Sequence, residues 1–210
     1  MRLNNYQKML EGIYGEKNHR DYTASDALLH VQEEAAKIDE GLRKDSREEI
    51  IKALPFLFCW LLSFCNMAGI NAEKAVWTKY QGICPYCGKK QHCMCISAET
   101  KPKAWINNPQ GTVPASLMDW QKMFQRIYGR INKMSWTIQI WLHFHEELGE
   151  ISKEFRLGNK IKMEEEFADC FAWLIALCNK LEIDLSEVVW NTYPGVCSHC
   201  KEKKCKCDKV

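Results

Sequence analysis

The segment from Met163 to Leu181 reads MEEEFADCFAWLIALCNKL, and it decides the fold of this 210-residue chain. Its second half, from Cys170 to Cys178, is apolar all round a helix, and a helix of that kind is buried. Glu166 and Asp169 precede this run at a spacing of three, so they share one helix face. We expect Asp169 to point inward, where a carboxylate needs a compensating cation.

A related segment occurs earlier, because the chain is a tandem repeat. A shift of 113 or 114 positions superimposes the first half on the second. The matched pairs include Gln7 and Gln121, His30 and His143, Glu33 and Glu146, Glu34 and Glu147, Trp60 and Trp173, Asn66 and Asn179, Trp77 and Trp190, and Cys84 and Cys197. Two related units of about a hundred residues each suit a chain of this length.

The two copies differ in their acidic residues. Glu150, Glu166 and Asp169 of the second copy are matched by Lys37, Ala53 and Phe56 in the first. We therefore expect a catalytic metal only in the second copy. In the first copy, Lys37 is placed either to pair with Glu33 or Glu34 or to reach a phosphate.

Helical periodicity is expected throughout, and alternating strand patterns are nearly absent. The expected helices are Asn5–Tyr14, Thr23–Leu42, Arg47–Met67, Asn71–Tyr80, Met118–Tyr128, Thr137–Phe155, Met163–Leu181 and Leu185–Asn191, with Asp184 or, more weakly, Ser186 as the N-cap of the last. The predicted fold is all-α, with two four-helix units. The predicted domains are residues 1–95 and 118–210, and the proline-containing residues 96–117 are the predicted linker.

One apolar run, Leu54 to Ile70, resembles a membrane span. Its 17 residues lie at the lower limit for crossing a bilayer. Its repeat partner, Phe167 to Ile183, carries Asp169 and charged residues near its end, so we expect both to be buried core helices and no membrane partner. No signal-peptide pattern begins the sequence, which favours a cytoplasmic location.

Twelve cysteines in a reducing compartment need an explanation other than disulfides. Eight form two clusters, each a C-x-x-C pair followed by a C-x-C pair: Cys84, Cys87, Cys93, Cys95 and Cys197, Cys200, Cys205, Cys207. Four thiolates complete a tetrahedral Zn²⁺ site and leave no open position, so we predict two structural zinc knuckles, at residues 84–95 and 197–207. An iron–sulfur cluster and unliganded thiols are the alternatives. Cys59, Cys65, Cys170 and Cys178 are predicted core residues.

The knuckles also raise a nucleic-acid alternative, because lysines surround them and small zinc modules bind RNA or DNA. The net charge of +2 argues against strong electrostatic binding of nucleic acid. We keep nucleic-acid binding as a less favoured alternative.

The acidic residues of the second copy fall on two consecutive helices: Glu146, Glu147 and Glu150 on one, Glu166 and Asp169 on the next. Clustered carboxylates repel one another unless a cation neutralises them. Oxygen ligands suit Mg²⁺ or Mn²⁺ rather than zinc. A Mg²⁺ ion held by carboxylates can bind phosphate oxygens and orient a water for attack.

The pattern Glu146-Glu147-x-x-Glu150, followed by Glu166-x-x-Asp169, resembles the EExxE…ExxD signature of the MazG-like all-α nucleoside triphosphate pyrophosphohydrolases. The resemblance covers about Trp120 to Tyr193 well and about Tyr6 to Tyr80 as a degenerate copy. The zinc knuckles are additions to the basic family pattern.

This resemblance implies a hydrolase that converts an NTP or dNTP to the monophosphate and pyrophosphate by water attack on the α-phosphorus. It implies that Glu146, Glu147, Glu150 and Asp169 hold Mg²⁺ or orient the water, and that Glu166 is a ligand or supports one. Which carboxylate is the general base stays open. The family commonly pairs subunits, so the two copies could form an intramolecular pseudo-dimer, and any further assembly is open.

Several residues near these acids are weaker candidates for contacts with the nucleotide. They are Lys160, Lys162, Trp141 and Asn191 in the second copy and Lys37 in the first. A non-catalytic module that senses a nucleotide, or that binds nucleic acid or protein through its zinc knuckles, is the alternative function.

Overall fold

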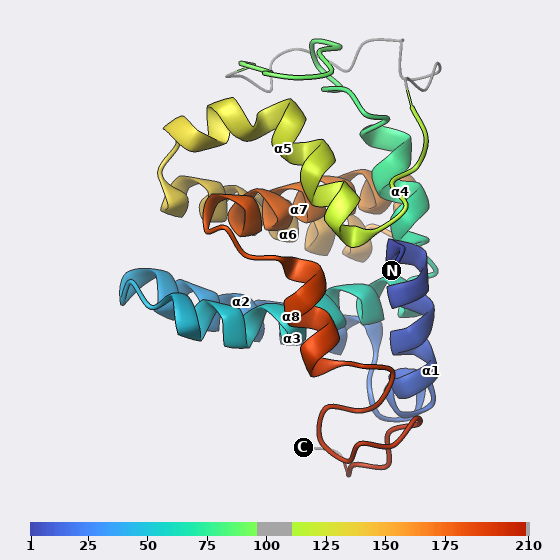
Figure 1. Ribbon diagram of the computed structural model, residues 1–210. Coiled ribbons are helices and arrows are strands. Elements are labelled where there is room, and N and C mark those ends of the chain that lie inside the picture. The colour runs from blue at the N-terminus through green and yellow to red at the C-terminus, as the bar shows by residue number, and fades with distance from the viewer. Residues whose placement is uncertain (96–110, 209–210) are drawn as a thin grey trace. The chain divides into compact units, whose positions relative to one another are not determined.

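The computed structural model describes residues 1–95 and 111–208. Over these residues the regular structure consists of eight α-helices and no strand, which confirms the all-α prediction (Figure 1). The helices are α1 (Leu3–Asp21), α2 (Ala24–Arg43), α3 (Arg47–Met67), α4 (Ala72–Lys79), α5 (Leu117–Met134), α6 (Thr137–Arg156), α7 (Lys160–Lys180) and α8 (Leu185–Thr192). Of the predicted linker, residues 96–110 lie outside the described residues.

Helices α1 and α5 extend beyond the ends predicted at Tyr14 and Tyr128. Gly15 and Gly129, which come directly after these tyrosines, lie inside the helices rather than beyond them. A helical glycine costs about 1 kcal/mol relative to alanine. In α1, the buried Asn18 and the basic His19 and Arg20 of the last turn favour the longer helix.

The helix starts follow the capping pattern. Asp184 is confirmed as the N-cap of α8, because its Oδ1 accepts the backbone N–H groups of Ser186 and Glu187 at 2.9 and 3.2 Å. Thr23 begins α2 with a capping box that it shares with Asp26. These bonds satisfy N–H groups that the first turn of a helix leaves unpaired.

The chain divides into two compact units that do not follow the sequence repeats. Unit 1 contains Met1–Asn71 and the residues from Asp184 onward, whereas unit 2 is the continuous segment Ala72–Ile183. Helix α4 of the first repeat therefore belongs to unit 2, and α8 of the second repeat belongs to unit 1. The unit boundaries cross the predicted domains 1–95 and 118–210.

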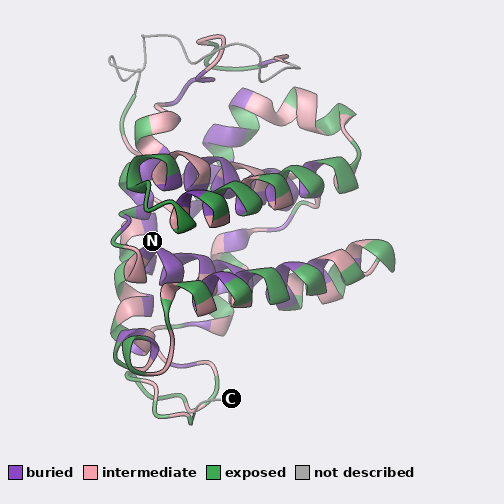
Figure 2. Ribbon diagram, turned by 180° about the vertical axis from the view of Figure 1, so that it is seen from behind, coloured by how far each residue is buried: buried purple, intermediate pink, exposed green. Residues whose placement is uncertain are grey.

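Each unit is built in the same way. In unit 1, α2 pairs with α3, and α1 and α8 pack on α3 (Figure 1). In unit 2, α6 pairs with α7, and α5 and α4 pack on α7. The long helices carry buried residues on one side and exposed residues on the other (Figure 2).

Helices α3 and α7 form the centres of the two cores. Leu57, Phe58 and Leu61 of α3 and Phe171 and Leu174 of α7 are all fully buried. By length and composition, α3 is the one described helix that could cross a membrane, and 67% of its apolar window is buried inside the structure. This burial agrees with the predicted core helix.

A buried polar clasp recurs at equivalent positions of both units. In unit 2, the Gln121 amide donates to Asn179 Oδ1 at 3.2 Å and to the Ile183 carbonyl at 2.9 Å. In unit 1, Gln7 makes the same two bonds to Asn66 and Ile70 at 2.9 and 2.7 Å. The sequence repeat is thus reproduced in individual hydrogen bonds.

Candidate functional site

Three carboxylates come together where α6 and α7 of unit 2 face one another. Glu147 and Glu150 come from α6 and Glu166 from α7, and one ligand oxygen of each lies within 4.8 Å of the others. Glu147 and Glu166 are half-buried and Glu150 is exposed. The cluster thus offers several oxygen donors while one side stays open to solvent.

The surroundings of this cluster favour protonation in the absence of a metal. Burial, reinforced by the charge of Asp169, raises the pKa of Glu147 to about 8. Burial also raises the pKa of Glu166, and the nearby Lys79 acts against this rise. A divalent cation would compensate the charge of these partly buried carboxylates.

Asp169 is buried, as predicted, and is paired with residues of the first repeat. It forms an ion pair with Lys79 at the end of α4, and its Oδ1 accepts a 2.5 Å hydrogen bond from the Tyr80 hydroxyl. Lys79 also donates to the Glu165 carbonyl at 3.4 Å. Burial raises the pKa of Asp169, whereas Lys79 and Tyr80 act to lower it. Asp169 is outside the group of three carboxylates that could hold a metal.

Glu146 is exposed and also lies outside that group. Its Oε2 is 2.6 Å from His143 Nδ1, and the His143 ring stacks on Trp173 at 4.4 Å. In unit 1, His30 makes the same contacts with Glu33 and Trp60, at 2.8 and 4.1 Å. Because this arrangement recurs in the acid-poor copy, it is a shared feature of the helix pair.

The weaker substrate candidates are dispersed. Lys160 is exposed at the start of α7, and Lys162 is 2.6 Å from Glu165. Trp141 is fully buried and stacks on Phe144 at 4.3 Å, so it is a core residue. Asn191 belongs to unit 1.

At the equivalent place in unit 1, both members of the buried ion pair are replaced. Phe56 occupies the position of Asp169. Its ring centroid lies 6.1 Å from that of Tyr193, the counterpart of Tyr80. Thr192 stands for Lys79. Lys37, also in unit 1, donates to Glu34 at 2.8 Å. The positions of Asp169 and Lys79 therefore hold an acid and a cation in unit 2, whereas both positions are uncharged in unit 1.

Sequence reasoning missed Lys79 and Tyr80 as members of this site. The pKa of Tyr86 is raised by burial and then by the charge of Asp169, so its hydroxyl lies within electrostatic range of the acids. One signal was present in the sequence. Lys79 of the first repeat aligns with Thr192 of the second, which is a further difference between the copies. The packing of α4 on α7 gives that difference its meaning.

Each cysteine cluster gathers its sulfur atoms into a set that could hold a metal. The Cys84 cluster belongs to unit 2 and the Cys197 cluster to unit 1. The Sγ atoms of Cys87 and Cys93 are 3.6 Å apart, and those of Cys197 lie 3.6 and 3.9 Å from Cys205 and Cys207. A tetrahedron with Zn–S bonds of about 2.3 Å has edges of about 3.8 Å. The donor sets therefore fit zinc, whereas a disulfide requires about 2.05 Å.

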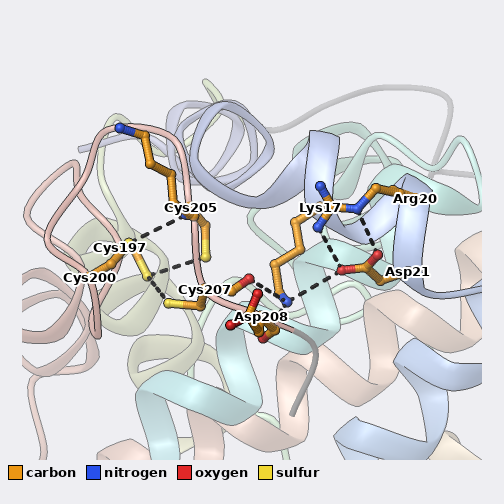
Figure 3. A network of polar contacts seen from close by, with 9 residues as sticks. Lys17, Arg20, Asp21, Cys197, Cys200, Cys205, Cys207 and Asp208 are labelled. Carbon is orange, nitrogen blue, oxygen red and sulfur yellow. Dashed lines mark hydrogen bonds and ion pairs between the residues drawn. The ribbon is translucent and has the colours of Figure 1, made fainter.

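The end of the Cys197 knuckle is bonded to α1 near the C-terminal end of that helix (Figure 3). Lys17 Nζ donates to the carbonyls of Cys207 and Asp208 at 3.1 and 2.9 Å. Asp21 in turn accepts hydrogen bonds from Lys17 and Arg20. The knuckle is thus joined to the helices of its own unit. The other four cysteines are buried in α3 and α7, as predicted: Cys59, Cys65, Cys170 and Cys178.

Comparison of the chain with protein-family models, with curated proteins and with solved structures gave no match. A function must therefore be inferred from the residues and their geometry. The site combines three clustered carboxylates, a buried acid and a lysine. This combination is suited to a divalent cation and an anionic ligand.

Proposed function

We propose that the protein is a Mg²⁺-dependent nucleoside triphosphate pyrophosphohydrolase with one working site, in unit 2. The observation that carries this proposal is the clustering of Glu147, Glu150 and Glu166 across α6 and α7. The resemblance of this segment to the EExxE…ExxD signature supports the same assignment. We include in the proposal a cytoplasmic location and a tandem pair of MazG-like units, each with one structural zinc knuckle.

The donor set fits Mg²⁺ or Mn²⁺. Glu147, Glu150 and Glu166 would supply the oxygen ligands, and the exposed side leaves room for the waters that Mg²⁺ retains. A bound ion of this kind polarises phosphate oxygens and makes a water molecule a better nucleophile.

The chain's own residues supply the rest of the chemistry. Lys79 brings a positive charge beside the carboxylates, where it can also attract a phosphate oxygen. Tyr80 and Lys79 together fix the orientation of the Asp169 carboxylate. The metal-free pKa of Glu147 is raised to about 8, so binding of Mg²⁺ would require this carboxyl group to release its proton.

The test is release of pyrophosphate from a panel of NTPs and dNTPs with Mg²⁺, comparing the intact chain with Asp169→Asn. Selective release that is lost in the folded variant would support the enzyme and name the substrate. Nucleotide binding without release, with both zinc ions present, would replace it by a nucleotide sensor. A salt-sensitive affinity for nucleic acid would instead indicate binding through the knuckles.

A further inference from the structure

Helix α4 carries Lys79 and is too short to be stable alone. It has eight residues, and an isolated helix of that length is marginal in water. It is held by its packing on α7, and the segment that follows it fixes the position of its end. Only Tyr80 to Ile83 lie between α4 and the first cysteine ligand, Cys84, and Gly82 makes the turn with a φ of 80°.

The Cys84 knuckle is fastened to α5 by backbone bonds. The N–H groups of His92 and Cys93 donate to the carbonyls of Arg126 and Ile127 at 3.1 and 2.7 Å. Cys84 itself is fully buried, and its N–H donates to the Lys89 carbonyl at 2.8 Å. The knuckle thus connects the end of α4 to α5.

Tyr128 of α5 joins this knuckle to the site. Burial raises the pKa of its hydroxyl, and the neighbouring Cys84 side chain, to which it hydrogen-bonds, raises this pKa further. Its ring meets the ring of Tyr80 edge-on, with centroids 6.2 Å apart at 87°. Tyr80 in turn donates to Asp169. A continuous series of contacts therefore runs from Cys84 through Tyr128 and Tyr80 to Asp169.

Unit 1 contains the same series with a different end. The Tyr14 hydroxyl accepts the N–H of Ser198, the residue after Cys197, at 3.1 Å, and a hydrogen bond to Cys197 contributes to its raised pKa. The centroids of the Tyr14 and Tyr193 rings lie 5.9 Å apart, with the rings at 90°. Tyr193 then contacts Phe56, which replaces the acid. The second knuckle therefore occupies the equivalent place in the unit that lacks Asp169 and Lys79.

We propose that Tyr128 is a positioning residue, through which the Cys84 knuckle of the degenerate repeat holds Tyr80 and Lys79 against Asp169 of the intact repeat. The knuckle that ends the intact repeat, at Cys197, has no such role in the acidic site. The expected effect of Tyr128 on kcat rests on the proposed function. The expected effect of Tyr128 on the stability of the end of α4 is independent of that function.

The test compares Tyr128→Phe with Tyr14→Phe in the full chain. Each variant removes one hydroxyl from equivalent positions and leaves all cysteine ligands in place. The measurements are zinc content, amide hydrogen exchange of α4 and α8, Mn²⁺ affinity, and kcat and KM for pyrophosphate release. Zinc content verifies that each variant keeps both knuckles loaded.

In Tyr128→Phe, we expect amide exchange of α4 to rise about tenfold, because its end opens locally. We expect kcat to fall about tenfold, because the pair on Asp169 is misplaced. KM and Mn²⁺ affinity should change less than about twofold, since Glu147, Glu150 and Glu166 lie on α6 and α7. In Tyr14→Phe, faster exchange should be confined to α8, with kcat unchanged.

Unchanged exchange of α4 in Tyr128→Phe would overturn the inference, as would an equal loss of kcat in Tyr14→Phe. A loss of Mn²⁺ affinity as large as the loss of kcat would show that Tyr128 stabilises the whole of unit 2, and this result would also overturn the inference. If the intact chain releases no pyrophosphate, the proposed function fails. The amide hydrogen exchange rates of α4 and α8 then still decide whether the knuckle positions α4.

Discussion

Lys79 and Asp169 form an ion pair within unit 2, although 90 residues separate them in the sequence. The side chains are only 15% and 11% exposed, so the pair is largely removed from water. Removing one member of a buried pair leaves an uncompensated charge, which is strongly destabilising. The first repeat thus supplies the cation that the buried acid of the second repeat requires.

Replacement of Lys79 by the residue of the other unit should expose this dependence. Lys79→Thr should lower the free energy of unfolding by about 3–5 kcal/mol, because Asp169 loses its partner. Adding Asp169→Phe recreates the Thr192 and Phe56 combination of unit 1 and should recover much of that loss, without restoring activity. Chemical denaturation of the metal-free chain measures both effects. A double variant no more stable than Lys79→Thr would contradict this interpretation of the pair.

The raised pKa of Glu147 makes stability and metal binding depend on pH. Between its ordinary pKa of 4.5 and its folded value of about 8, the folded chain holds a proton that the unfolded chain has released. This group therefore contributes stability below about pH 4.5 that is lost as the pH rises to about 8. The Mg²⁺-free chain should accordingly lose stability across this range relative to Glu147→Gln, as thermal unfolding of both proteins can measure.

Binding of Mg²⁺ should displace the same proton. Ligand carboxylates must be deprotonated, so binding at about pH 6.5 should release about one proton, and binding at about pH 9 should release almost none. Calorimetry in buffers of different ionisation enthalpy counts these protons, with Glu147→Gln as the control. Equal proton release at both values would show that Glu147 is not the titrating ligand.

The two cysteine clusters should hold two Zn²⁺ ions per chain. Cys87→Ser should lose one ion and Cys200→Ser the other, since each ligand is half-exposed and belongs to one cluster only. Elemental analysis after gel filtration measures the stoichiometry. Iron with inorganic sulfide in place of zinc, or retention of two ions in either variant, would contradict the assignment.

The buried clasp of unit 2 should be costly to remove. Gln121→Met deprives the Ile183 carbonyl and Asn179 of a donor and should cost about 1–3 kcal/mol. Gln125→Met, on the exposed side of the same helix, should change stability by less than about 0.5 kcal/mol. Equal effects of the two substitutions in urea denaturation would refute the importance of the clasp.

The sequence was sufficient to predict features that depend on local spacing. The helical class, most helix boundaries and the two cysteine clusters follow from periodicity and from ligands close together in the chain. The inward direction of Asp169 also followed, because the apolar run after it identifies a buried helix face.

The packing of α4 and α8 in the unit of the other repeat could not be predicted in this way. The two repeats present related central helices, α3 and α7, and the periodicity of a short helix does not reveal which of them it will pack against. Lys79 was overlooked for the same reason, because its partner lies on the central helix of the other repeat. The extension of α1 past Gly15 was missed because packing outweighs a local helix propensity.

The measurement that tests the central claim most directly is a comparison of Glu147→Gln with its repeat counterpart, Glu34→Gln. Both carboxylates lie at the equivalent position of their repeats, but only Glu147 groups with two further acids. Initial rates of pyrophosphate release at saturating Mg²⁺ should fall by about 10²-fold or more in Glu147→Gln. They should change less than about threefold in Glu34→Gln. Equal losses in both variants, or full activity in Glu147→Gln, would contradict a single working site in unit 2.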